Sequence, residues 1–360
     1  MRVLLVEPYF GGSHRAWAEG YRAHSAFEVE LITLPARWWR WRMRGGFVTL
    51  AERAAGLAGR GYRPDVILAT DMVDLAGLRG LLPRSWAPVP SVLYLHESQL
   101  TYPDSHQLEP DLSYAFTNWT SALAADLCVF NSEYHRESFF DEVPRLLRQF
   151  PDHRHGHLVE EVRARSRVVP VGVDLSWIRP RKSSPPLVLW NHRWEHDKNP
   201  DEFLRAIVDV APDLDFRLAL CGASFGNDAP GFARARDLLG DRVVAFGHAP
   251  LDRNRSLVNQ ADVVVSTALQ EFFGISVVEA VAAGAVPVLP DRLSYPEIIP
   301  AAVHEQVFYS EGRLADALAT VIASREARLK LAAVTAPAMS RYAWGAVAPL
   351  LDGLLAEAEV

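Results

Sequence analysis

The chain has 360 residues, of which 49% are hydrophobic and 22% charged, and its formal net charge is −7. This composition excludes a disordered or fibrous chain, and the length fits two domains of ordinary size. No apolar run reaches the roughly 20 residues of a membrane span, and Cys128 and Cys221 lie in strand-like runs, which argues against a disulfide framework. We therefore expect a cytoplasmic protein with no membrane partner.

Short β-like runs alternate with amphipathic helical stretches along the chain, which is typical of parallel sheets covered by helices on both faces. In the first half, the predicted strands are residues 2–7, 28–34, 65–70, 91–97, 127–132 and 167–173. Beyond a linker at 179–186, the predicted strands are residues 187–192, 217–222, 242–248, 262–267 and 285–290. Two Rossmann-like domains facing a central cleft are therefore predicted, with a helix at the end of the chain.

The first strand is followed by the turn EPYFGGSH, residues 7–14, and we expect a helix from about Arg15. Gly11 and Gly12 allow a tight turn and let a ligand approach the backbone amides at a helix start. The turn does not fit G-x-G-x-x-G, which argues against a dinucleotide site. A paired glycine that serves only as a turn remains the alternative.

The second domain opens with LWNHRWEHDKNP, in which Arg193 and Lys198 follow a strand end and Asn199 is expected to cap the next helix. Two fixed cations at the carboxyl end of a strand suit a diphosphate, and Lys198 is one of only three lysines. A solvated loop is the alternative. His192 and His196 have a metal-like spacing but lack an H-E-x-x-H motif, so we predict no metal there.

The stretch STALQEFFGISVVEAVAAG, residues 266–284, carries the strongest signal. A strand ends at Thr267, a loop holds Glu271 and Gly274, and a helix with Glu279 on its second turn is expected to end at Gly284. Free amides at a helix start bind anions without any side chain. The sequence therefore predicts an anion site flanked by paired glutamates.

These stretches resemble the retaining GT-B glycosyltransferases, and together they are similar to the tRNA-queuosine alpha-mannosyltransferase family. The segments that carry this resemblance, in the family's order, are GGSH, LPA..W.WR.R, LHESQLTYP, VFNS, FPDHR, HRWEHDKNP and EFFGISVVEAV. The resemblance implies a GT-B fold with an acceptor-binding domain over 1–175, a nucleotide-sugar-binding domain over 176–340, and a C-terminal helix over 341–360 that crosses back to the first domain.

The resemblance also implies roles for individual residues. Those expected to be catalytic are His96, Arg193, Lys198 and Glu271. Those expected to bind the donor are Gly247, His248, Phe273, Gly274, Ile275, Ser276 and Glu279. Those expected to bind the acceptor are Gly11, Gly12, Ser13, His14, Glu97, Gln99, Tyr102, Asn131, Arg40 and Arg42, with residues 11–14 forming a loop that closes over donor and acceptor.

The implied reaction moves mannose from GDP-mannose, with retention, onto the cyclopentenediol of queuosine in tRNA, with the nucleotide sugar as co-substrate and no cofactor. The one D-x-D, residues 213–215, lies before a predicted strand rather than after it, so we predict a metal-independent reaction. The same donor chemistry on a small metabolite, lipid or saccharide is the alternative. A non-catalytic module that binds tRNA or a nucleotide sugar is a third interpretation.

The segment PARWWRWRMRGG, residues 35–46, holds four arginines and three tryptophans and no acid. Arginine binds phosphate in a forked geometry and tryptophan stacks on exposed bases, so an RNA contact is one interpretation. The other is that the tryptophans anchor a loop to the first domain while the arginines extend to water.

Overall fold

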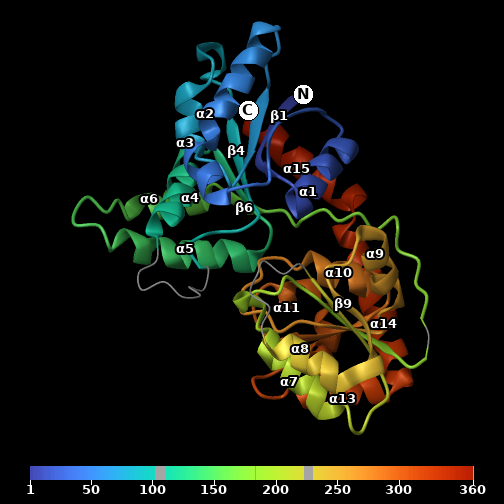
Figure 1. The fold of residues 1–360 in the computed structure, drawn as a ribbon. Helices are drawn as coiled ribbons and strands as arrows, with labels where there is room; N and C mark the ends of the chain where they lie inside the picture. The colour runs from blue at the N-terminus through green and yellow to red at the C-terminus, as the bar shows by residue number, and fades with distance from the viewer. Residues whose placement is uncertain (102–110, 183, 223–229, 360) are drawn as a thin grey trace. The chain divides into compact units, whose positions relative to one another are not determined.

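The computed structural model describes residues 1–101, 111–182, 184–222 and 230–359, and these form two compact units (Figure 1). The N-terminal unit consists of Met1–Gly172 together with Trp344–Val360, and the C-terminal unit is Val173–Ala343. Each unit contains one sheet of six parallel strands. The predicted α/β class with two doubly wound sheets is therefore confirmed.

The N-terminal sheet has the strand order β2-β1-β3-β4-β5-β6. Its strands are β1 (Arg2–Phe10), β2 (Glu28–Pro35), β3 (Val66–Thr70), β4 (Ser91–Leu95), β5 (Leu127–Phe130) and β6 (Ser166–Val168). The helices of this unit are α1 (Gly12–His24), α2 (Trp39–Gly59), α3 (Leu75–Leu81), α4 (Leu112–Ala124), α5 (Glu133–Leu147), α6 (His157–Ala164) and α15 (Trp344–Glu359).

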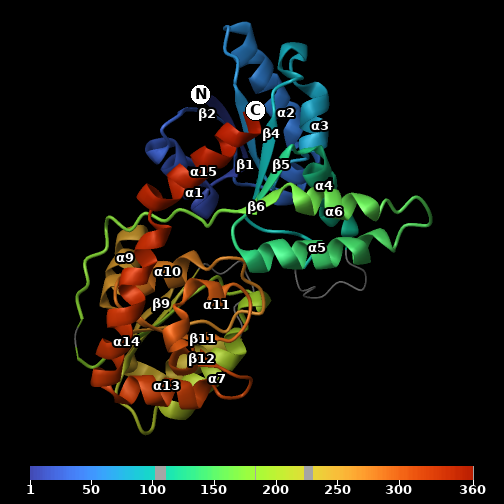
Figure 2. The same cartoon turned by 180° about the vertical axis from the view of Figure 1, so that it is seen from behind.

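Helices cover both faces of this sheet. Alternate residues of a strand point to opposite faces, and in β1 both sets are apolar and need to be covered. Leu4 and Val6 of β1 pack in one hydrophobic core with residues of α2, α3, α4 and α5. Val3 and Leu5 point to the other face and are also fully buried. On that face α1 and α15 lie side by side, as Figures 1 and 2 both show.

The C-terminal helix α15 is fixed to the N-terminal unit by a buried acid. Asp352 accepts hydrogen bonds from Tyr21 Oη (2.6 Å), Ser25 Oγ (2.7 Å) and the Ala26 amide (2.8 Å). Trp344, at the start of α15, lies so close to Gly172 that a Cβ there would come within 2.4 Å of the indole ring. The segment after 343 is therefore an integral part of the N-terminal core.

The C-terminal sheet has the order β12-β11-β10-β7-β8-β9. Its strands are β7 (Leu187–Asn191), β8 (Arg217–Cys221), β9 (Val243–Gly247), β10 (Val263–Val265), β11 (Val286–Pro290) and β12 (Phe308–Tyr309). Its helices are α7 (Pro200–Val210), α8 (Pro230–Leu239), α9 (Leu251–Gln260), α10 (Ile275–Ala282), α11 (Tyr295–Ile298), α12 (His304–Val307), α13 (Leu314–Ala323) and α14 (Arg325–Ala338). Counted from β7, this is the Rossmann order, whereas the N-terminal sheet has a flavodoxin-like order.

The structure departs from the local predictions at three places, although Asn199 does occupy the predicted N-cap position. Helix α1 begins at Gly12 rather than near Arg15, so Gly12, Ser13 and His14 form its first turn instead of a closing loop. Asn199 occupies the N-cap position of α7 in a left-handed conformation (φ 47°) that makes no side-chain cap bond, and its amide donates to Glu202 instead. The strand predicted over 167–173 is limited to β6, and the two-residue strand β12 was not predicted.

Candidate functional site

The candidate donor site lies at the point where the strand order of the C-terminal sheet reverses. Strands β7 and β10 are hydrogen-bonded neighbours, and the chain leaves their carboxyl ends in different directions, toward β8 and β11. Ligands of open α/β sheets bind at such switch points. The loop after β7 carries Arg193 and Lys198, and the loop after β10 carries Glu271 and Gly274. The sheet topology therefore brings the two predicted stretches together.

Lys198 joins these two loops. Its side chain is almost buried (7% exposed), and its Nζ donates to the Gln270 carbonyl (2.6 Å) and to Glu271 Oε2 (3.3 Å). The Lys198 carbonyl in turn accepts from Thr267 Oγ1 at 2.7 Å. Burial lowers the pKa of Lys198, but Glu271 and Asp197 raise it by more, so the ammonium is charged. A fixed cation is therefore held at the end of β10.

Arg193 adds a second, more accessible cation. Its guanidinium is 45% exposed and lies 3.1 Å from Glu195 Oε2 and 3.9 Å from Asp197 Oδ2. Asp197 Oδ2 also lies 3.1 Å from Lys198 Nζ, so one carboxylate is shared by both cations. An exposed ion pair contributes little free energy and can be broken easily, whereas breaking a buried ion pair costs several kcal/mol. Arg193 can therefore reorient toward a ligand while Lys198 stays in place.

Helix α10 supplies backbone donors beside the ammonium. Gly274 is its N-cap at φ 93°, a conformation that favours glycine, and the amides of Ile275 and Ser276 open the helix. Burial raises the pKa of Glu271, but Lys198, together with His192 and Arg193, lowers it by more, so this carboxylate is charged. The predicted group of Arg193, Lys198, Glu271 and the α10 start is thus assembled within one unit.

Other predicted donor residues have different surroundings. Glu279 lies on α10, and burial raises its pKa to about 7, although Arg255 opposes this shift. Gly247 ends β9, the edge strand, and the exposed His248 follows it, so both lie two strands away from β7. Phe273 is buried, and its ring packs against Tyr342 with centroids 5.2 Å apart.

In the N-terminal unit, the strand order reverses between β1 and β3, and a buried ion pair lies there. Glu7, fully buried within β1, accepts from the Tyr9 amide (2.7 Å) and lies 3.2 Å from His14 Nδ1. Burial lowers the pKa of His14, but three nearby carboxylates, Glu7 foremost and then Asp71 and Glu97, together raise it by more, to about 9. His14 is therefore an imidazolium at neutral pH.

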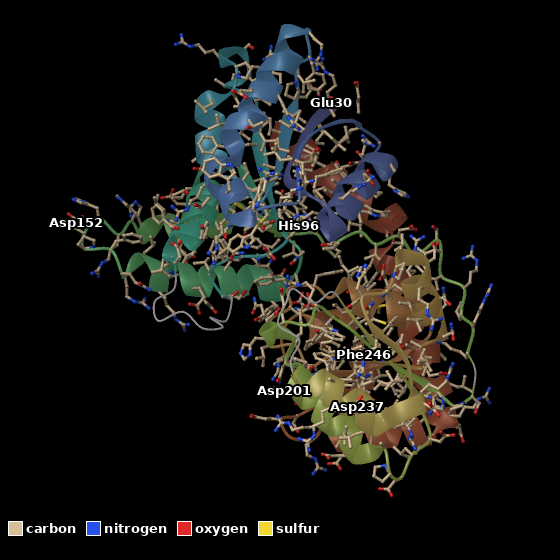
Figure 3. The ribbon with its side chains drawn as sticks, viewed as in Figure 1. Glu30, His96, Asp152, Asp201, Asp237 and Phe246 are labelled. Atoms are coloured by element: carbon tan, nitrogen blue, oxygen red, sulfur yellow. The ribbon has the colours of Figure 1, made fainter. Side chains whose placement is uncertain are left out.

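His96 (Figure 3) packs beside this pair at the end of β4. Its ring lies 4.9 Å from the ring of His14 and 4.6 Å from that of Trp17, both edge to face. Its backbone is fixed at both ends, because its amide donates to Asp71 Oδ1 (2.8 Å) and its carbonyl accepts from Asn131 Nδ2 (2.8 Å). Within the described residues, the buried His96 Nε2 has no hydrogen-bond partner.

The remaining predicted acceptor residues differ in their surroundings. Ser13 is exposed on α1, and Gly11 lies so close to Ala36 that a Cβ on it would be 2.5 Å from the alanine Cβ. Gln99 donates to Glu97 Oε1 at 3.2 Å. Tyr102 lies outside the described residues.

The segment 35–46 is helical from Trp39 onward, and its arginines divide between surface and core. Arg40 is exposed, with its guanidinium 5.4 Å from the centre of the Trp39 ring. Arg42 is buried, and its Nε donates to the Pro35 carbonyl at 3.2 Å. Arg40 is therefore available to a ligand, whereas Arg42 holds the end of β2.

Among the described residues, one group could hold a metal ion: the ligand atoms of Glu7, His14 and His96 all lie within 4.8 Å of one another. The ion pair between Glu7 and His14 accounts for much of this proximity. A protonated imidazole is not a ligand, so a metal would first have to displace the proton of His14.

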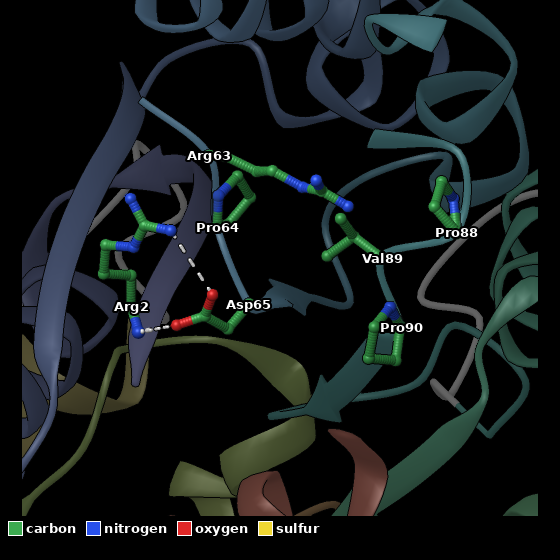
Figure 4. Close-up of a pocket in the computed structure, with 7 residues that line it drawn as sticks. All are labelled: Arg2, Arg63, Pro64, Asp65, Pro88, Val89 and Pro90. Carbon is green, nitrogen blue, oxygen red and sulfur yellow. Dashed lines mark hydrogen bonds and ion pairs between the residues drawn. The ribbon is translucent and has the colours of Figure 1, made fainter. Parts of the chain in front are cut away.

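A cavity of about 280 Å³ lies elsewhere in the N-terminal unit (Figure 4). It is lined by Arg2, Arg63, Pro64, Asp65, Pro88, Val89 and Pro90, which precede or begin β1, β3 and β4. This is the amino end of the sheet, opposite to the loops described above, so we assign it no role in the site. None of the helices in the described ranges has the length and apolarity to cross a membrane.

Sequence reasoning missed Glu7, Asp71 and Asp197 as members of these groups. Asp71 directly follows β3, at the switch point, and is almost fully buried, which raises its pKa to about 8. Its position right after a predicted strand was an available signal. Glu7 pairs with His14, and Asp197 pairs with Arg193 and Lys198 of its own loop, and spacing alone does not show that these side chains turn toward one another.

The comparisons with known proteins agree with this arrangement. The family model for the N-terminal part of tRNA-queuosine alpha-mannosyltransferases matches residues 2–173, and that for group 1 glycosyl transferases matches residues 174–335. A tRNA-queuosine alpha-mannosyltransferase of Drosophila melanogaster is 34% identical over 315 residues, which cover 83% of this chain and 81% of the relative. A GDP-mannose:cellobiosyl-diphosphopolyprenol alpha-mannosyltransferase of Xanthomonas oryzae is 31% identical over 144 residues, 38% of each chain.

Two solved structures share the fold over nearly the whole chain. Sucrose-phosphate synthase from Thermosynechococcus elongatus has a TM-score of 0.73 and 17% identity, covering 99% of this chain and 98% of that one. Anabaena HepE in complex with UDP and glucose has a TM-score of 0.67 and 17% identity, covering 99% and 100%. These likenesses confirm the predicted GT-B class of fold. With 34% identity to a relative of which it covers 81%, the chain belongs to the tRNA-queuosine alpha-mannosyltransferase family.

Proposed function

We propose that this protein is a retaining glycosyltransferase that moves mannose from GDP-mannose onto the cyclopentenediol of queuosine in tRNA. In this proposal, the C-terminal unit binds the nucleotide sugar and the N-terminal unit binds the acceptor. The observation that carries it is the ammonium of Lys198, fixed by the Gln270 carbonyl (2.6 Å) and Glu271 (3.3 Å) at the switch point of a Rossmann-ordered sheet. Family membership supplies the donor and acceptor classes.

The chemistry explains these residue types. When the bond between the sugar anomeric carbon and the phosphate oxygen breaks, the oxygen keeps the electron pair and the leaving diphosphate gains negative charge. Donors fixed where charge develops stabilise the transition state. Lys198, Arg193 and the first amides of α10 can supply this positive charge, so we propose that the reaction needs no divalent ion.

Glu271 has a double role in this proposal. Its carboxylate holds Lys198 in place, and its remaining lone pairs can accept hydrogen bonds from hydroxyls of the transferred sugar. Glu279 is proposed to accept from the ribose hydroxyls. As in other retaining GT-B enzymes, the acceptor oxygen bonds to the anomeric carbon on the face that the phosphate leaves, and the hydroxyl proton passes to the departing phosphate.

The test is to incubate the full chain with GDP-mannose, GDP-glucose, UDP-glucose or UDP-galactose, and with tRNA that carries or lacks queuosine. Mass spectrometry of the digested nucleosides should show one added hexose, with GDP-mannose and on queuosine only. Lys198→Ala should abolish the product, whereas Lys330→Ala, which removes an exposed lysine, should not. Transfer to tRNA that lacks queuosine, or to small acceptors only, would contradict the proposal.

A further inference from the structure

Two tryptophan side chains in the segment 35–46 are unusually exposed. Trp38 is 72% exposed and Trp41 is 61% exposed, and the two are three residues apart at the start of α2. Trp39, between them, packs against the small cluster of Met43, Met72 and Tyr114. Trp39 therefore anchors the segment, and its two neighbours remain in solvent.

The local structure around each exposed ring is specific: Trp38 has an unusual backbone conformation, and Trp41 packs on a glycine. Trp38 has left-handed dihedrals (φ 49°, ψ 58°), which a bulky residue rarely adopts and which tend to persist at functional sites. Trp41 lies against Gly45, where a Cβ would come within 2.6 Å of its ring. A strained tryptophan and a tryptophan seated on a glycine are both kept at the surface rather than folded into the core.

The positive charge around the two rings indicates a partner that carries negative charge. Arg37 and Arg40 are exposed beside them, and the segment contains no acid although the whole chain has a net charge of −7. Arg44 is also exposed, over the Tyr114 ring (4.9 Å), but it is paired with Asp111 (3.3 Å). Guanidinium groups contact phosphates, and indole rings stack on unpaired bases with little sequence preference. This combination fits a single-stranded RNA loop.

The exposed side chains of Arg37, Trp38, Arg40 and Trp41 form a patch, and this patch adjoins the candidate acceptor residues. Tyr9 packs against the same small cluster as Trp39, and the ring of Tyr9 lies 5.8 Å from that of His14. Ala36, at the start of the segment, is in contact distance of Gly11. An RNA loop whose modified base reaches His14 would have neighbouring nucleotides beside the patch.

We infer that Trp38 and Trp41 form a stacking platform for the bases that flank the modified nucleotide in the anticodon loop, with Arg37 and Arg40 binding the adjacent phosphates. This inference rests on the proposed function for the identity of the RNA. A membrane surface fits less well, because the apolar face of α2 packs into the core through Leu50, Ala54 and Leu57 and is not available to a bilayer.

The experiment compares binding of a queuosine-bearing anticodon stem-loop to the full chain and to variants, by fluorescence anisotropy without donor. Trp41→Ala places a good helix former at an exposed helical position, and Trp38→Gly places the residue that a positive φ favours, so neither should lower the melting temperature. Each should weaken binding about tenfold, since a stacked base contributes roughly 1–3 kcal/mol. Leu81→Ala, which removes another exposed apolar side chain of the same unit (52% exposed), should bind like the parent.

Two further measurements, of turnover and of vesicle binding, distinguish this inference from the proposed function and from a membrane contact. Turnover of free queuosine nucleoside should be unchanged in Trp38→Gly and Trp41→Ala, while turnover of tRNA falls. Parent-like RNA binding by both variants, or loss of binding to anionic vesicles (phosphatidylserine and phosphatidylcholine) without loss of RNA binding, would overturn the inference. Weakened RNA binding in a protein that transfers no hexose would support the platform and contradict the proposed function instead.

Discussion

Removing the Lys198 ammonium should destabilise the C-terminal unit as well as stop the reaction. Lys198 is 7% exposed, and its Nζ lies 3.1 Å from Asp197 Oδ2 and 3.3 Å from Glu271 Oε2. Replacement by methionine keeps most of the side-chain volume and leaves the buried carboxylate of Asp197 and the partly buried carboxylate of Glu271 without their shared cation. Breaking a buried pair in this way costs about 3–5 kcal/mol, so we expect Lys198→Met to lose about that much unfolding free energy.

A second substitution tests whether the lost charge is the cause. In Lys198→Met/Glu271→Gln, the carboxylate of Glu271, which has lost its lysine partner, is replaced by a neutral amide, so the double variant should recover about 2 kcal/mol relative to the single variant. Activity should not recover, because the diphosphate has still lost its ammonium. Lys330→Met is the matched control, since its side chain is 74% exposed and should change stability by less than about 1 kcal/mol.

The assay is urea unfolding of each full-length variant, followed by circular dichroism at pH 7, beside hexose transfer. The pKa of Glu271 is lowered below its ordinary 4.5, so its contribution is present above that value and lost as the pH falls through the folded pKa. The pKa of Lys198 is raised above 10.5, so its contribution is present below that value and lost at higher pH. The penalty of Lys198→Met should therefore shrink in acid. A double variant as unstable as the single one would refute this reasoning.

Three further predictions concern other groups. The imidazole of His14 should titrate near pH 9 by NMR, and at a lower pH in Glu7→Gln, which removes the strongest of the carboxylates that raise its pKa while Asp71 and Glu97 remain; the stability from this pair should be full below pH 6.5 and be lost as the pH rises through 9. Asp352→Ala should lose about 2–4 kcal/mol in urea unfolding, because three donors lose their acceptor. Hexose transfer should persist in excess EDTA, and a loss that Mg²⁺ or Mn²⁺ restores would indicate a metal.

The sequence predicted the position of the donor site because strand ends are visible as patterns. Apolar runs that end in polar residues locate the loops after β7 and β10, and Gly274 marks the helix start. What remained hidden is that these strands are neighbours, since Lys198 and Glu271 are 73 residues apart and their pairing follows from sheet order. The carboxylate of Asp197 was hidden for a different reason: its partners Arg193 and Lys198 lie in its own loop, and spacing does not show which way side chains turn in a loop.

The start of α1 shows a different limit. Its N-cap is Gly11, which has no side chain to cap the helix, so the polar signal that usually marks a helix start is missing. Placing the helix three residues late assigned His14 to a loop. In the structure, His14 lies on the first turn, and this position lets its ring reach the Glu7 carboxylate on β1.

The helical periodicity of α2 explains why Arg42 was wrongly grouped with Arg40 as an exposed residue of the segment 35–46. Treated as a loop, the segment offers Arg40 and Arg42 as equivalent phosphate contacts. As a helix from Trp39, it places residues 39, 42, 43, 46 and 50 on one face, because neighbours on a helix surface are three or four residues apart. Arg42 therefore falls on the inner face, where it is buried, while Arg40 and Trp41 fall on the outer face. The helical register thus decides which arginines of the segment face solvent.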